Sequence, residues 1–304
     1  MTPEPAPVQK VDSEQKGVTS PTINDTFFNR LYNRISHRIL GKLHKSAGVC
    51  TPISRSRIIK TGHRVCLREA ATMKFVAEHT SIPVPKVYCS FVYKGRAFIL
   101  MERIRGDAIP NAWARLPEAA RQKVYSQLKD MIQELRALQP SPGTGVESCM
   151  GGELFDSRIS RCPTFGPFKT VQDFHFWPRD GLTPSGAKHN IEDGEWRDIE
   201  KMVAIQDASW PPPVFTHGDL NPANIIVRGD KVVGIIDWEF AGWYPHYWEY
   251  TSAFYGNVTR TDWQDAVDQF LEPFPAELEM EGTRNRWWGE IEGGERYDER
   301  VSNG

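Results

Sequence analysis

The chain has 304 residues, of which 39% are hydrophobic and 25% charged, with a formal net charge of −2 and five cysteines. This composition is typical of a globular protein large enough for two lobes, and a net charge so near zero gives no reason to expect a nucleic-acid partner. The odd cysteine number without a C-x-x-C pair indicates neither a disulfide framework nor a zinc site, and the lack of any run of about 18 apolar residues predicts no transmembrane segment, so a cytoplasmic protein is expected.

Residues 1–24 are predicted to form a disordered tail, because Pro, Ser, Glu and Lys dominate there and little can be buried. The tail also lacks the apolar stretch of a signal peptide. A helix is then expected to begin at Asn24 or Asp25 and to continue to about Lys45. Its apolar residues recur at helical spacing, at Phe28, Leu31, Ile35 and Ile39.

The same helix carries a second, basic face. Its members recur every four residues, at Arg30, Arg34, Arg38 and Lys42. We expect the helix to pack on the lobe that follows, with its basic face in solvent. Binding of the basic face to an anionic membrane surface is the alternative.

The next elements are typical of a small β-sheet lobe. They are a strand at 57–60, a helix at 68–79 that Pro83 and Pro85 prevent from continuing, and strands at 87–93 and 96–104 joined by a hairpin turn at Lys94-Gly95.

A larger, helical part is expected to follow. Apolar residues trace one face of a long helix over 117–138, and a second helix is expected over 193–206. Residues 139–190 are rich in Pro, Gly and Ser, and the pattern there supports no assignment.

The strongest chemical signal lies in 214–227, where one apolar run enters a polar loop and another leaves it. The loop contains Asp219 and Asn224, five residues apart. A second apolar run, 232–236, then ends on Asp237. The two segments are predicted to form a β-hairpin that delivers all three oxygen-bearing side chains to one end.

Protein kinases carry H-R-D, four further residues and Asn, and later D-F-G. This chain has His217-Gly218-Asp219, Asn224 and Asp237-Trp238-Glu239. With Gly in place of the middle Arg, the pattern resembles the aminoglycoside phosphotransferase and choline-kinase-like family. The stretch 234–245 looks like fungal members of that family, and the resemblance covers roughly residues 50–255.

The resemblance implies an α+β, bilobal protein-kinase-like fold with a small β-sheet N-lobe and a larger, mainly helical C-lobe. The N-lobe, with the preceding basic helix, would span residues 25–104. The C-lobe would span residues 105–304 and would contain the catalytic loop and an acidic, Trp-rich tail.

The resemblance also implies a transferase that uses ATP and Mg²⁺ and phosphorylates a hydroxyl of a small molecule. Asp219 would accept or orient the proton of that hydroxyl, and Asn224 and Asp237 would hold Mg²⁺. These residue types suit the reaction, because Mg²⁺ prefers oxygen ligands and phosphoryl transfer needs an oriented nucleophile.

The N-terminal half would bind the nucleotide. By resemblance, Lys60 at the end of its strand would hold the phosphates, and Glu69 at the start of the helix would position Lys60. Met101 would line the adenine pocket, and the backbone of Glu102 and Ile104 would meet the adenine edge. An ordinary surface ion pair is the alternative for Lys60 and Glu69. The same helix also carries Lys74 and Glu78, so the identity of the pair is ambiguous.

Two further features of the sequence are unusual, the stretch before Lys60 and the distribution of charge. Gly48 is the only glycine in the stretch 43–60 before the lysine, so a glycine-rich phosphate loop is not expected. Its lack favours a second interpretation, a catalytically inactive nucleotide-binding or scaffold protein of the same fold. Charge is also uneven, with ten basic and no acidic residues in 26–68 but fourteen acidic and five basic residues in 239–304. The acidic segment could attract a cationic acceptor, or the two segments could pair with each other or face solvent.

Overall fold

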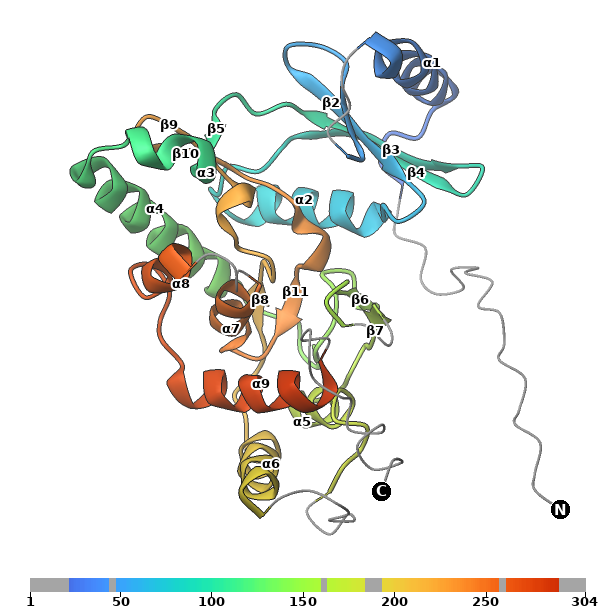
Figure 1. The fold of residues 1–304 in the computed structure, drawn as a ribbon. Helices are drawn as coiled ribbons and strands as arrows, with labels where there is room; N and C mark the ends of the chain where they lie inside the picture. The colour runs from blue at the N-terminus through green and yellow to red at the C-terminus, as the bar shows by residue number, and fades with distance from the viewer. Residues whose placement is uncertain (1–21, 44–47, 160–162, 184–192, 257–260, 290–304) are drawn as a thin grey trace, which may run out of the picture.

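The computed structural model describes residues 22–43, 48–159, 163–183, 193–256 and 261–289. They form a small N-terminal lobe built on a β-sheet and a larger, mainly helical C-terminal lobe (Figure 1). Residues 1–21 of the predicted tail and residues 290–304 of the predicted acidic tail lie outside the described residues. Ile23 pairs with Ser90 of the sheet, so the structured chain reaches back at least to that residue.

The N-terminal lobe is a four-stranded antiparallel sheet with the order β1-β2-β4-β3. The predicted hairpin turn between β3 and β4 is confirmed, because Lys94 and Gly95 both have positive φ, as a type I′ turn requires. The lobe consists of α1 (Phe27–Leu43), β1 (Cys50–Pro52), β2 (Arg57–Gly62), α2 (Leu67–His79), β3 (Val87–Tyr93) and β4 (Arg96–Glu102).

Helix α2 covers the inner face of this sheet. It buries Ala70, Met73 and Val76 in the main hydrophobic core, which also contains residues of the C-terminal lobe. The helix ends where the Thr80 N–H donates to Val76 O, and Pro83 follows shortly afterwards. A backbone hydrogen bond from Ile235 N–H to Pro83 O, 2.8 Å long, then joins the two lobes.

Helix α1 covers the outer face of the sheet with its polar side. Its polar side meets the sheet, with Asn33 buried, Arg30 over the ring of Phe91 and Arg34 over the ring of Tyr93. Its apolar side faces away from the lobe. The helix packs on the lobe as expected, with Arg34 and Arg38 exposed, but its apolar side is exposed as well. Periodicity groups residues on a face without saying which face meets the protein. The cap is Thr26, which accepts from Asn29 N–H, and neither Asn24 nor Asp25.

The C-terminal lobe contains the two helices predicted from periodicity, α4 and α6. Its helices are α3 (Ile109–Ala112), α4 (Glu118–Arg136), α5 (Val171–Phe176), α6 (Asp193–Gln206), α7 (Trp248–Tyr255), α8 (Thr261–Val267) and α9 (Pro275–Trp288), with 3₁₀ turns η1 (Trp113–Arg115), η2 (Pro222–Asn224) and η3 (Trp238–Phe240). The described residues of this lobe also form three small antiparallel sheets. The first contains β5 (Asp107–Ala108), β9 (Ile225–Arg228) and β10 (Lys231–Ile235). The second pairs β8 (Val214–Thr216) with β11 (Gly242–Tyr244), and the third pairs β6 (Leu154–Phe155) with β7 (Thr164–Phe165).

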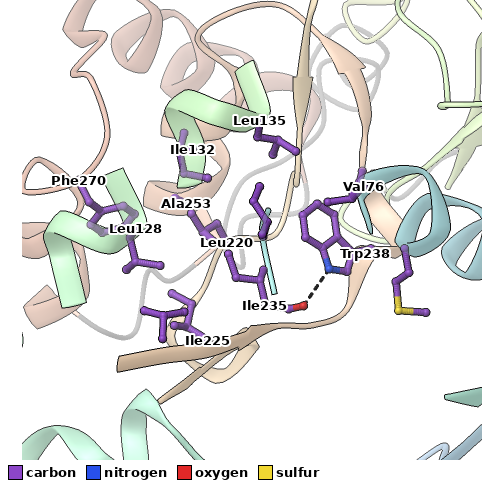
Figure 2. Close-up of a cluster of buried hydrophobic side chains, with 14 of the residues drawn as sticks. Val76, Leu128, Ile132, Leu135, Leu220, Ile225, Ile235, Trp238, Ala253 and Phe270 are labelled. Atoms are coloured by element: carbon purple, nitrogen blue, oxygen red, sulfur yellow. Dashed lines mark hydrogen bonds between the residues drawn. The ribbon is translucent and has the colours of Figure 1, made fainter. Parts of the chain in front are cut away.

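Trp238 joins the β9–β10 hairpin of the C-terminal lobe to helix α2 of the N-terminal lobe (Figure 2). Its ring is buried in the main core with Val76 of α2, and its indole N–H donates to Ile235 O over 2.9 Å. A buried indole needs such an acceptor, because an unsatisfied donor in an apolar core is costly. The contact fixes the chain directly after Asp237 against the helix that carries Glu69.

Candidate active site

Three polar positions converge at one end of the β9–β10 hairpin. The loop that follows β8 carries Asp219 and Asn224, and Asp237 follows β10. The Ile236 N–H donates to Asn224 O over 2.9 Å, so the two segments lie side by side. Asp237 itself has a φ of +67°, a left-handed conformation that a non-glycine residue seldom adopts. Such backbone strain is common at functional sites, where surrounding contacts hold it.

Lys60 joins these elements to the N-terminal lobe. Its ammonium lies 2.8 Å from Glu69 Oε2 and 2.5 Å from Asp237 Oδ1. Lys60 and Glu69 are buried, whereas the Asp237 side chain is 38% exposed. The structure thus brings three of the predicted site residues together from both lobes. The other charged pair on α2, Lys74 and Glu78, lies on the exposed surface.

Burial and charge act against each other in this cluster. Burial alone would lower the pKa of Lys60, but the carboxylates of Glu69, Asp237 and Glu239 outweigh it and hold the pKa above its ordinary value. Burial raises the pKa of Glu69 to about 7, and the ammonium of Lys60 opposes that rise. Lys60 therefore stays protonated, and the charge of Glu69 depends on Lys60.

Glu239 adds a carboxylate that the sequence analysis did not assign to the site. Its Oε2 lies 3.7 Å from the Lys60 ammonium. Ligand oxygens of Glu69, Asp237 and Glu239 all lie within 4.8 Å of one another. The signal in the sequence was its position two residues after Asp237.

Asp219 and Asn224 contact each other directly. The Asn224 amide nitrogen donates to Asp219 O over 2.9 Å and to Asp219 Oδ2 over 2.8 Å. Because both bonds use the nitrogen, the Asn224 side-chain oxygen is left for another partner. The clustered carboxylate oxygens of Asp237 and Glu239 are hard ligands of the kind that a magnesium ion prefers, and the Asn224 oxygen is of the same type, so these residues suit such an ion.

Arg158 is a member of the site that the sequence did not indicate. Its guanidinium donates to Gly218 O over 2.6 Å and lies 3.8 Å from Asp219 Oδ1, while two bonds of 2.6 and 2.8 Å fix it to Asp156. Burial raises the pKa of Asp219, and Arg158 is the largest opposing influence. Arg158 comes from the stretch 139–190 that sequence patterns left without assignment.

Glu249 holds the backbone of the loop that carries Asp219. It is buried in α7 and accepts from the backbone N–H groups of His217, over 2.6 Å, and Gly218, over 3.1 Å. His217 is buried as well, and burial lowers its pKa. Its Nδ1 accepts from Asp219 N–H, so in the neutral ring Nε2 carries the proton and donates to Ile236 O. These bonds hold the loop and indicate a structural role for His217.

Gly218 occupies a position where the backbone admits no other residue without strain. Its φ is +80°, and a Cβ there would lie 2.8 Å from Phe240 O. Both the left-handed conformation and the close approach require glycine. This explains in physical terms why the kinase arginine is absent from this chain's loop.

The predicted hinge lies at the end of β4. Met101 is buried and pairs with Ile58 of β2 and Val87 of β3. The Glu102 N–H already donates to Lys86 O. Among the described residues no acceptor is found for the Ile104 N–H, which is therefore available to a ligand. The adenine site at these positions stays a prediction.

The segment between β1 and β2 has no glycine-rich phosphate loop, as the sequence predicts. The β1–β2 turn is short and contains no glycine, with Ile53 N–H donating to Arg57 O. Gly48, just before β1, has a φ of +59° and open space where a Cβ would lie. Residues 44–47 lie outside the described part of the chain.

The model of the phosphotransferase enzyme family (APH) matches residues 55–284, which is more than half of the chain. The chain belongs to this family. The resemblance seen in the catalytic loop is thereby confirmed, and so is the protein-kinase-like fold with its two lobes.

Two curated relatives match parts of the chain. A probable acyl-CoA dehydrogenase, IBR3, from Arabidopsis thaliana is 25% identical over 194 residues, which are 61% of this chain and 22% of that protein. A homoserine kinase from Brucella anthropi is 33% identical over 82 residues, which are 23% of this chain and 25% of that protein. The chain thus spans a quarter or less of the length of either relative.

Solved structures of phosphotransferases are also similar. Aminoglycoside phosphotransferase APH(4)-Ia is 14% identical with a TM-score of 0.48, covering 78% of this chain and 80% of that chain. The gentamicin complex of APH(2")-IIa is 15% identical with a TM-score of 0.48, covering 86% of each chain. Macrolide 2'-phosphotransferase MphH from Brachybacterium faecium is 16% identical with a TM-score of 0.44, covering 75% of this chain and 74% of that chain.

We predict that Gly218→Ala lowers the free energy of unfolding by clearly more than Gly229→Ala. Both glycines have positive φ, but only Gly218 faces a backbone oxygen, whereas Gly229 faces open space. The control should cost about 1 kcal/mol, the ordinary cost of alanine in a left-handed conformation. Chemical denaturation of the two variants measures the difference. Equal losses would show that the loop moves away from Phe240 without cost.

Proposed function

We propose that the chain transfers the γ-phosphate of ATP to a hydroxyl group of a small molecule in a Mg²⁺-dependent reaction. One observation carries the proposal, the convergence of Lys60 and Glu69 from the N-terminal lobe on Asp237, next to the loop of Asp219 and Asn224. A phosphotransferase needs a fixed cation for the phosphates, oxygen ligands for a metal and a group that orients the nucleophile. The two lobes supply all three.

Each residue has a role in this proposal. Lys60, held by Glu69, binds phosphate oxygens, and Asn224, Asp237 and Glu239 would hold Mg²⁺. The ion, when bound, supplies positive charge that offsets the charge of the transferred group. Asp219 orients the acceptor hydroxyl and takes its proton, while Met101 and the backbone of Glu102 and Ile104 receive adenine.

The charge of the protein gives little support to a cationic acceptor. The excess of acidic residues after Glu239 first favoured a cationic acceptor, but several of these residues pair within the protein. Glu239 lies beside Lys60, Glu279 binds Lys201 and Glu281 binds Arg284. We place the reaction in the cytoplasm, because the described cysteines form no disulfide with one another.

We predict that Asp219→Asn lowers phosphate transfer from radiolabelled ATP, in a metabolite-library screen, by about a hundredfold or more, because the amide cannot take the proton. Binding of the nucleotide should persist. The exposed Asp230→Asn is the matched control and should keep full activity. Transfer at the natural rate by the Asp219 variant would contradict the role. Mg²⁺-dependent nucleotide binding without transfer to any acceptor by the natural chain would instead identify an inactive nucleotide-binding or scaffold protein.

We predict that Arg158→Met moves the acid limb of the kcat/KM profile to higher pH. Asp219 must be ionised to take a proton, and Arg158 lowers its pKa, so without Arg158 ionisation requires a higher pH. Arg158→Lys, which keeps the charge, should move the limb less.

Removal of Arg158 also leaves the buried Asp156 without its guanidinium partner. The double variant Asp156→Asn/Arg158→Met removes that unpaired charge and should show the same shift. Arg115→Met, at an exposed ion pair, is the control and should leave the profile unchanged. An acid limb at the same pH in the natural chain and the Arg158 variants would show that Arg158 does not act on Asp219.

A further inference from the structure

Helix α1 presents a continuous apolar stripe to the outside of the molecule. Phe28 is 78% exposed, Ile39 55% and Ile35 48%, and the spacing of three and four residues places them on one side of the helix. Single exposed apolar residues are normal, but a contiguous stripe on one helix is a sign of an interaction site. The stripe consists of Phe27, Phe28, Leu31, Tyr32, Ile35 and Ile39.

The helix cannot bury this stripe by turning over, because its opposite side is already fixed. Asn33 is fully buried and donates to Asn29 O over 2.8 Å and to the Cys89 thiol over 3.2 Å. The guanidinium of Arg34 lies 3.7 Å from the centre of the Tyr93 ring. Turning the helix would break the contacts of Asn33 with Cys89 and of Arg34 with Tyr93.

The surroundings of the stripe are positively charged. Helix α1 contains Arg30, Arg34 and Arg38 and no acidic residue. The nearest acidic residue, Asp25, is held by Arg30 at 2.5 and 2.6 Å. Arg34 and Arg38 are exposed along one flank of the stripe.

We infer that α1 binds an anionic lipid surface, with the apolar stripe in the boundary between headgroups and acyl chains and the basic flank on the headgroups. Amphipathic helices with aromatic and aliphatic residues on one side and arginines on the other bind membranes in this way. A second copy of the chain fits less well, because pairing two stripes would bring two basic flanks together. The helix lies on the surface and does not span the bilayer, since no helix in the described ranges is long and apolar enough to cross one.

This attachment leaves the active site open. Side chains alternate along β2, so Ile59 packs toward α1 whereas Lys60 faces α2 and the C-terminal lobe. Helices α1 and α2 lie on opposite faces of the sheet (Figure 1). The inference therefore does not rest on the proposed transfer reaction.

The test is co-sedimentation of the full-length chain with vesicles of phosphatidylcholine containing roughly a quarter phosphatidylserine. The chain should sediment with these vesicles, bind pure phosphatidylcholine vesicles at least tenfold more weakly, and be released as salt rises. Failure to bind the anionic vesicles would overturn the inference, even if the helix bound a protein instead.

Two variants locate the binding surface. Phe28→Gln/Ile35→Gln, at exposed positions, should abolish sedimentation, and Arg34→Gln/Arg38→Gln should weaken it roughly tenfold or more. Val92→Gln/Phe176→Gln, which changes exposed apolar residues elsewhere, should bind like the natural chain. Circular dichroism checks that each variant is folded. Unchanged binding by both α1 variants would overturn the inference, as would a dimer in sedimentation velocity without lipid that Phe28→Gln/Ile35→Gln dissociates.

Discussion

The buried ammonium of Lys60 is the constraint on which the site depends. A buried lysine is stable only with compensating partners, and here they come from three elements, Glu69 of α2, Asp237 after β10 and Glu239 of η3. The ion pairs therefore join the two lobes at the point where a nucleotide's phosphates would lie. Trp238 follows Asp237 and precedes Glu239 in the sequence, and its ring packs against α2. This apolar contact reinforces the same junction.

The catalytic loop is held by a second set of buried contacts, from the C-terminal lobe alone. Glu249 accepts two backbone N–H groups, Gly218 allows a close approach to Phe240, and Arg158 binds the Gly218 carbonyl beside Asp219. With its backbone fixed, Asp219 is positioned before any substrate arrives. Preorganisation of this kind lowers the cost of orienting a nucleophile, so the local geometry and the proposed reaction agree.

Much of this arrangement could be predicted because local patterns determine it. The spacing of Asp219, Asn224 and Asp237 and the Lys-to-Glu interval between strand and helix follow from continuous segments of chain. Arg158 and Glu249 could not be predicted, since each acts through a contact with residues distant in sequence. The side of α1 that meets the sheet could not be predicted for a related reason. Its two faces were visible in the sequence, but the aromatic outer face of the sheet, which attracts its arginines, forms only in the folded lobe.

The most direct test of the account is calorimetric titration of a Mg²⁺ complex of a non-hydrolysable ATP analogue into the double variant Lys60→Met/Glu69→Met. Removing both partners avoids a stranded buried charge, so the protein should remain folded. Lys74→Met/Glu78→Met, which removes an exposed pair from the same helix, is the matched control. The account predicts binding by the natural chain and the control and a loss of binding in the Lys60 variant. Binding of equal affinity by all three proteins would contradict it.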